Sequence, residues 1–139
     1  KANAVFETEN AYCIRDTLIV CWYSVSWPPI FWMNDFAEVL PLVTGEKSLG
    51  NVDNLIKIAE RQLNLKRLFN AREGITRKDD TLPKRFTDEP MPDGPGKGQV
   101  VDLDPMLDDY YRLRGWDKET GLPTDDTIKR LSLEWAHID

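Results

Sequence analysis

Histidine and cysteine are scarce in this chain, and long apolar runs are missing. Its 139 residues include one histidine, His137, and two cysteines, Cys13 and Cys21. We expect no ordinary triad of nucleophilic catalysis within the chain, because the one histidine lies in the terminal Trp-Ala-His-Ile-Asp run, where we expect it at the surface. Two cysteines are too few for a small disulfide-built scaffold. No stretch reaches the roughly 18 uninterrupted apolar residues of a membrane span, so we expect no membrane partner.

An excess of positive charge is also absent. Eighteen Lys and Arg face 24 Asp and Glu, which gives a formal net charge of −6. A general nucleic-acid binder needs clustered basic side chains to displace counterions from phosphates, so we expect no nucleic-acid partner. The shares of apolar residues (41%) and charged residues (30%) are typical of a globular domain. A chain of this length can bury a core as one domain.

The most apolar segment lies at residues 18–33. Pro28 and Pro29 prevent one continuous helix through it, so it is either a buried strand followed by a turn or a short buried helix. The segment is either ordinary core or an apolar strap that contacts another protein body. Its large aromatic side chains are Trp22, Trp27, Phe31 and Trp32.

Residues 34–74 carry apolar side chains at helical spacing and predict two helices. The first contains Pro41, which should bend or restart it. The second has the broadest apolar face in the sequence. We expect Asn51 or Asp53 to cap its beginning and Gly74 to follow its end.

Proline and glycine are concentrated in residues 75–103, which predict a long extended loop of a functional or flexible kind. Residues 104–139 predict two terminal helices, capped by Asp104 and Thr124. The fold class that follows is mostly α: a single compact helical domain over residues 1–139, with an apolar N-terminal strap and a long Pro/Gly-rich loop.

The two cysteines allow two interpretations. Both can be reduced and buried thiols, because unpaired cysteine is among the most buried residue types. Alternatively, one of them binds a metal, and further ligands then come from elsewhere. Adjacent aspartates at 108–109 and 125–126 point in different directions on a helix, so solvated or capping roles fit them better than chelation.

Residues 70–80 alternate charged side chains around a predicted helix end. The ordinary interpretation is an exposed, salt-bridged cap in which each pair contributes at most about 1 kcal/mol. The alternative is a structured hinge in which Arg72 and Arg77 bind neighbouring carbonyl or carboxylate groups.

Four stretches of the chain resemble the tungsten-containing aldehyde:ferredoxin oxidoreductase family. They include residues 65–85, Leu-Lys-Arg-Leu-Phe-Asn-Ala-Arg-Glu-Gly-Ile-Thr-Arg-Lys-Asp-Asp-Thr-Leu-Pro-Lys-Arg, and continue through 89–95, 107–117 and 121–124. The resemblance covers nearly the whole chain. It implies the α-helical C-terminal domain of such an enzyme, in which residues 1–33 face the cofactor. It also implies that the chain is a fragment of a longer protein.

The same resemblance implies cofactors. The family binds tungsten, or in some members molybdenum, between two pterin dithiolenes beside a [4Fe–4S] cluster. One cluster cysteine lies in a motif of Asp-x-x-Gly-Leu-Cys type, and Asp16-Thr-Leu-Ile-Val-Cys21 occupies its place here. Cys21 would then bind cluster iron, and Asp16 would accept hydrogen bonds from the pterin.

Two neighbours of these residues belong to the implied site, and two residues depart from the motif: Ile19 stands in place of its glycine and Val20 in place of its leucine. Ile14 and Val20 stand where family members contact the pterin through backbone groups. Ile19 replaces the motif's glycine, which would be costly if the backbone there requires a positive φ. Cys13 has no role in the family pattern. Since the family's proton-transfer residues lie upstream, we assign no catalytic residue to this chain.

The function that the resemblance implies is oxidation of an aldehyde to a carboxylic acid, with ferredoxin as electron acceptor, in an anaerobic cytoplasm. The expected partners are the N-terminal remainder of the same polypeptide, ferredoxin and a second copy of the enzyme. The aromatic strap suggests an alternative, the tungsten subunit of a benzoyl-CoA reductase-like enzyme. A third hypothesis is a stand-alone helical interaction module without redox activity.

Overall fold

The computed structural model describes residues 1–25 and 31–136 and shows a mostly helical chain, as predicted. Within these residues the one β-type pairing is an isolated bridge between Trp116 and Pro123. No helix in the described part is long and apolar enough to cross a membrane. The helices are α1 (Ala2–Thr17), α2 (Trp22–Val25), α3 (Met33–Thr44), α4 (Val52–Arg72), α5 (Lys84–Thr87), α6 (Leu103–Arg114) and α7 (Asp125–Arg130), with 3-10 turns η1 (Lys47–Gly50) and η2 (Arg77–Asp79).

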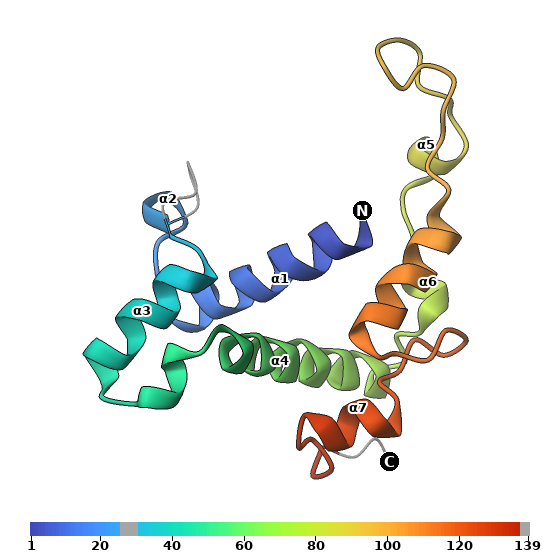
Figure 1. Cartoon of the computed structure of the whole chain (residues 1–139). Helices are drawn as coiled ribbons and strands as arrows, with labels where there is room; N and C mark the ends of the chain where they lie inside the picture. The colour runs from blue at the N-terminus through green and yellow to red at the C-terminus, as the bar shows by residue number, and fades with distance from the viewer. Residues whose placement is uncertain (26–30, 137–139) are drawn as a thin grey trace.

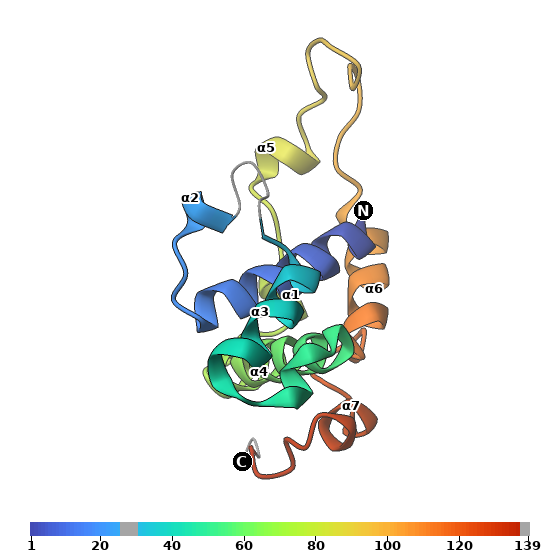
Figure 2. The same cartoon turned by 60° about the vertical axis from the view of Figure 1, so that its left-hand side comes forward.

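The long helix α4 is the base on which the other elements are assembled. Helix α1 packs along α4 and also contacts α6, while α3 and η1 pack at the N-terminal end of α4 (Figure 1). Helix α7 lies near the C-terminal end of α4 in both views (Figure 2). The chain between α5 and α6 projects away from the helices, which places most of the Pro/Gly-rich loop outside the packed region.

Helix α1 is the element that the sequence pattern did not predict. Its buried face is narrow and includes a polar residue, Asn10, so the apolar spacing typical of an amphipathic helix is weak. Ala11, Cys13 and Ile14 nevertheless bury it against α4.

Of the predicted apolar strap, α2 is described, whereas Trp27, Pro28 and Pro29 lie outside the described residues, as does His137. The main core cluster comprises Ala11, Cys13, Ile14, Met33, Phe36, Ala37, Leu55 and Ala59.

The predicted helices of residues 34–74 are present, and their ends follow local chemistry. Helix α3 continues through Pro41 and ends at Gly45, whose φ of 75° is readily adopted by glycine. The side chain of Asn51 accepts a hydrogen bond from the Asp53 N–H and caps α4, as expected. Gly74 follows the end of α4 with a positive φ.

The terminal part confirms one predicted cap and corrects another. Thr124 caps α7 by accepting a hydrogen bond from the N–H of Thr127. Asp104 does not cap α6: the N-cap is Asp102, and Asp104 lies within the first helical turn. An acidic side chain is still favourable there, because the N-terminal end of a helix carries partial positive charge. The predicted loop also contains the short turns η2 and α5.

A buried arginine joins α4 to two later segments. Arg67, 6% exposed, donates hydrogen bonds to the carbonyl of Gly121 at 2.7 Å and to both carboxylate oxygens of Asp80 at 3.0 and 2.7 Å. Its guanidinium also lies 4.8 Å from the centre of the Trp116 ring, and it donates to the hydroxyl of Tyr111. A buried charge is tolerated only when it is paired and hydrogen-bonded. Each of the three guanidinium nitrogens of Arg67 donates to at least one of these oxygens.

A second buried arginine joins α6 to α1. Arg114 is 0% exposed and binds the side-chain oxygens of Asn10 at 2.8 Å and Glu9 at 2.7 Å. Its Nε donates to the hydroxyl of Tyr110 at 3.0 Å. This contact fixes the middle of α1 relative to α6, while Ala11, Cys13 and Ile14 pack the following residues into the apolar core.

Replacement of Arg67 should be costly because it removes one partner from a buried charge pair. We expect Arg67→Met to lower the free energy of unfolding by about 3 kcal/mol. The matched control is Arg72→Met on the same helix, where the ion pair with Glu73 is long and exposed, and the expected change is within about 0.5 kcal/mol. Urea unfolding of the three proteins measures both values. Equal losses in the two variants would contradict the role given to Arg67.

Candidate functional site

The candidate cofactor site is the turn that ends α1. Leu18 is the last residue with helical backbone, and Ile19 follows in the left-handed region with φ of 56°. The N–H of Ile19 donates to the carbonyl of Asp16 at 3.2 Å, and the N–H of Val20 donates to the carbonyl of Arg15 at 3.3 Å. These two bonds define a Schellman turn, the common way for a helix to end on a left-handed residue.

Ile19 occupies a conformation that suits glycine. Among the described residues only Ile19 and Ser132 have a positive φ without being glycine. A left-handed residue with a Cβ costs roughly 1–2 kcal/mol, and a β-branched one is a marked outlier. The side chain is 92% exposed, so packing does not offset this cost. The backbone at the motif's glycine position therefore does have a positive φ, and in this chain isoleucine occupies that position.

The turn brings Asp16 and Cys21 to one exposed end of α1. The side chain of Asp16 is 65% exposed, and Cys21 is exposed as well. Val20, directly before Cys21 in the chain, is half-buried. The proposed thiol and carboxylate ligands thus stand on a surface that another part of a larger protein can cover.

Ile14 lies in a different setting. Its side chain is 3% exposed and belongs to the core, and its carbonyl oxygen accepts the N–H of Leu18 at 3.0 Å. The contacts of Ile14 and Val20 with a pterin remain predictions, and for Ile14 the backbone carbonyl is already used within the helix end.

The two cysteines have separate roles in the structure. Cys13 is 6% exposed, and its thiol donates to the side-chain oxygen of Gln62 on α4 at 3.2 Å. Burial raises the pKa of the Cys13 thiol, which keeps it protonated and unsuited to bind metal. The interpretation of two buried thiols is right for Cys13 and wrong for Cys21.

The donor groups present fit one part of an iron–sulfur site. Thiolates are the usual ligands of such clusters, and Cys21 offers one at the surface. Across residues 1–25 and 31–136 no group of three or more His, Cys, Asp or Glu side chains is gathered to hold a metal ion. A cluster bound to Cys21 therefore takes its other ligands from outside the described residues.

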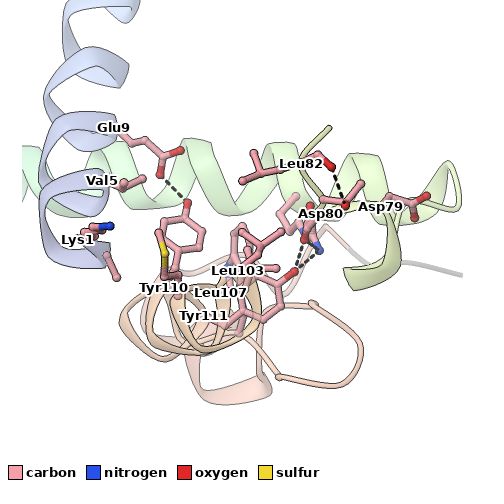
Figure 3. Close-up of a pocket in the computed structure, with 15 residues that line it drawn as sticks. Lys1, Val5, Glu9, Asp79, Asp80, Leu82, Leu103, Leu107, Tyr110 and Tyr111 are labelled. Atoms are coloured by element: carbon pink, nitrogen blue, oxygen red, sulfur yellow. Dashed lines mark hydrogen bonds and ion pairs between the residues drawn. The ribbon is translucent and has the colours of Figure 1, made fainter. Parts of the chain in front are cut away.

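A pocket of about 490 Å³ lies between α1, α6 and η2 (Figure 3). Its polar groups bind one another: Tyr110 donates to Glu9 at 2.5 Å, and Tyr111 donates to Asp80, which is already paired with Arg67. Since these atoms are occupied, the pocket wall is a structural network. The remaining wall is largely apolar and includes Val5, Leu82, Leu103, Met106 and Leu107.

The contacts of Arg77 and Arg72 decide between the two interpretations of residues 70–80. Arg77 binds the carbonyl of Lys118 at 3.1 Å and the carboxylate of Asp108 at 2.8 Å, as the hinge alternative predicted. Arg72 instead remains exposed. The sequence pattern did not point to Arg67 and Asp80. One signal for a buried arginine was available: Arg67 directly precedes Leu68, which is buried on the apolar side of α4.

The fold and the turn define a helical domain that exposes one cysteine and one carboxylate at the end of α1. Comparison with known proteins then identifies the family: the description "Aldehyde ferredoxin oxidoreductase, domains 2 & 3" matches residues 1–133. The chain belongs to the aldehyde ferredoxin oxidoreductase family, which confirms the resemblance seen in the sequence.

Relatives named as tungsten-containing aldehyde ferredoxin oxidoreductase support this assignment. The protein of Pyrococcus horikoshii is 51% identical over 102 residues, which cover 73% of this chain and 16% of that relative. The protein of Thermococcus kodakarensis is 50% identical over 76 residues, 54% of this chain and 13% of that relative. The Pyrococcus furiosus protein is 50% identical over 74 residues, 52% of this chain and 12% of its own length. The chain therefore spans about one sixth or less of the relatives that it matches.

The strain at Ile19 predicts a stabilising substitution. Ile19→Gly should raise the free energy of unfolding by about 1 kcal/mol, because the relief of left-handed strain exceeds the added freedom of glycine in the unfolded chain. Leu18→Gly is the control with the opposite expected sign, since Leu18 has helical backbone and packs against the core. Chemical denaturation of both variants tests the pair. A destabilised Ile19→Gly protein would contradict the strain at this position.

The pocket network predicts a pH dependence. Burial and the hydrogen bond to Asp80 raise the pKa of Tyr111 to about 12, from the ordinary value of 10.0. The folded state therefore holds this proton more tightly, so the contribution of Tyr111 to stability is complete below about pH 10 and is lost as the pH rises through about 12. The stability difference between the unmodified protein and Tyr111→Phe should be constant below about pH 10 and should shrink above it. Unfolding midpoints across this range measure the difference, and one that stays constant to about pH 12 would refute the assignment.

Proposed function

We propose that this chain is the part of a tungsten-containing aldehyde:ferredoxin oxidoreductase that supplies one cysteine ligand, Cys21, to a [4Fe–4S] cluster and one carboxylate, Asp16, to the neighbouring pterin. The observation that carries the proposal is the exposed position of both side chains on one strained turn. Family membership over residues 1–133 supports it, because the turn lies inside the matched region.

When bound, the tungsten–pterin group and the cluster supply the oxidation of an aldehyde and water to a carboxylic acid, with release of two protons and two electrons that ferredoxin accepts one at a time. The residues of this chain bind and position. The Cys21 thiolate binds iron, and the Asp16 carboxylate accepts hydrogen bonds from the pterin. Backbone groups of Ile14 and Val20 belong to the same proposed contact. Molybdenum in place of tungsten would leave these roles unchanged.

The position of the turn depends on how α1 is held on α4. Gln62 of α4 accepts hydrogen bonds from the thiol of Cys13 at 3.2 Å and from the hydroxyl of Thr17 at 2.8 Å, one turn before Cys21. The carbonyl oxygen of Cys13 lies 2.7 Å from the same Thr17 hydroxyl and shares its single proton with Gln62. Because the last turn of α1 is fixed to α4, the backbone that carries Asp16 is held in place before a cofactor binds, and the turn toward Cys21 starts from this fixed point.

The proposed partners are the remainder of the enzyme, ferredoxin and a second copy of the enzyme, acting in the cytoplasm. The side chains around the turn support a covering polypeptide, since Ile19 is 92% exposed, Tyr23 79% and Trp22 36%. Apolar surface of this kind beside a proposed ligand is typical of an interface that closes over a site.

The ligand role of Cys21 can be tested on the full-length protein by iron analysis and electron paramagnetic resonance. We expect Cys21→Ser to lose the signal of the reduced [4Fe–4S] cluster, because one of its thiolates is gone. Cys13→Ser is the matched control and should keep the signal, since a hydroxyl can donate to Gln62 as the thiol does. A [4Fe–4S] signal of full intensity in Cys21→Ser would remove Cys21 from the ligand set.

A further inference from the structure

The side chain of Arg15 is held between two aromatic rings beside the turn. Its guanidinium carbon lies 4.4 Å from the centre of the Tyr12 ring on α1 and 5.4 Å from the Trp22 ring on α2. The two ring centres are 6.0 Å apart, and the arginine side chain is only 13% exposed. A guanidinium in this position is attracted to both ring faces, and the attraction is stronger when the charge is partly removed from water.

The same guanidinium orients the carboxylate of Asp16. Nε and Nη2 of Arg15 both donate to Oδ1, at 2.8 and 2.6 Å. No described residue donates a hydrogen bond to Oδ2 of Asp16. One oxygen is therefore fixed by the arginine, and the other can accept a hydrogen bond from a bound group.

Arg15 also joins the two sides of the turn. Its backbone carbonyl accepts the N–H of Val20, and its side chain contacts Trp22 directly after Cys21. A strained residue such as Ile19 persists only where the surrounding contacts determine its conformation. These contacts of Arg15 span the strained residue from Asp16 to Trp22.

We propose that Arg15 is a positioning residue for this cofactor site: it orients the Asp16 carboxylate, holds the turn that carries Cys21, and places a positive charge beside the cluster. The inference rests on the proposed function, because it assumes that Asp16 and Cys21 face the cofactors. The charge offsets that of Asp16, so the turn adds little net charge to the surroundings of the cluster. Nearby charge is one of the factors that set the reduction potential of an iron–sulfur cluster.

The test compares Arg15→Met and Arg15→Lys in the full-length protein. Methionine removes the charge, whereas lysine keeps it but loses the planar group that stacks and donates twice to one oxygen. The control is Arg112→Met on α6, which breaks an exposed Arg–Asp pair of similar length, 3.0 Å to Asp109, far from the turn in sequence. A redox titration followed by electron paramagnetic resonance gives the cluster potential, and hydrogen exchange gives the protection of the Ile19 and Val20 amides.

We expect Arg15→Met to lower the cluster potential and to speed exchange of the two amides about fivefold or more. Arg15→Lys should retain the original potential but still exchange faster, and Arg112→Met should match the unmodified protein in both readouts. If Arg15→Met does not assemble, unchanged amide exchange in Arg15→Lys overturns the proposal and faster exchange supports it.

Two other results would overturn the inference while the proposed function stands. The first is an unchanged cluster potential in Arg15→Met. The second is a cluster potential that falls as far in Arg15→Lys as in Arg15→Met, which would show that the charge of Arg15 is not the cause. In both cases Cys21→Ser still loses the cluster. A cluster that survives Cys21→Ser is instead the failure of the proposed function, whatever the Arg15 variants show.

Discussion

The packing of α1 against α4 is the interaction on which the candidate site depends. Ala11 and Ala59 are 2% and 0% exposed at this contact, and small side chains allow two helices to approach closely. Gln62 then fixes the last turn of α1 through Cys13 and Thr17. The turn that follows therefore begins at a residue that is anchored to α4. A site built in this way is preorganised, because its first contacts are made on the rigid helix below it.

Buried charge completes the frame around this contact. Arg114 holds the middle of α1 to α6 through Asn10 and Glu9, and Arg67 holds α4 to the segments that follow it. Such pairs add less stability than an apolar core of equal volume, but they are costly to break and they permit few alternative arrangements. Strain is concentrated elsewhere, at Ile19, where a left-handed backbone and a β-branched side chain coincide next to the proposed ligands. Conformational strain beside rigid packing is a common property of functional turns.

Much of the fold and part of the site followed from sequence. The helix ends at Asn51, Gly74 and Thr124 were predictable because capping and left-handed residues act locally. Helix α1 was not, since its burial depends on α4 and α6 rather than on its own apolar spacing. Motif resemblance alone led to Asp16 and Cys21, because one cysteine without further ligands carries no local signal of a cluster. The role of Arg67 was hidden for the same reason: its partners lie 13 and 54 positions away.

The central claim is that the sulfur of Cys21 binds iron in the complete enzyme. Anomalous diffraction at the iron edge, on crystals of the full-length protein, tests it most directly. Our account predicts an iron atom bonded to Sγ of Cys21, with the carboxylate of Asp16 on the pterin side of the same turn. A complete cluster held by four other residues, with Cys21 outside bonding distance of iron, would contradict it.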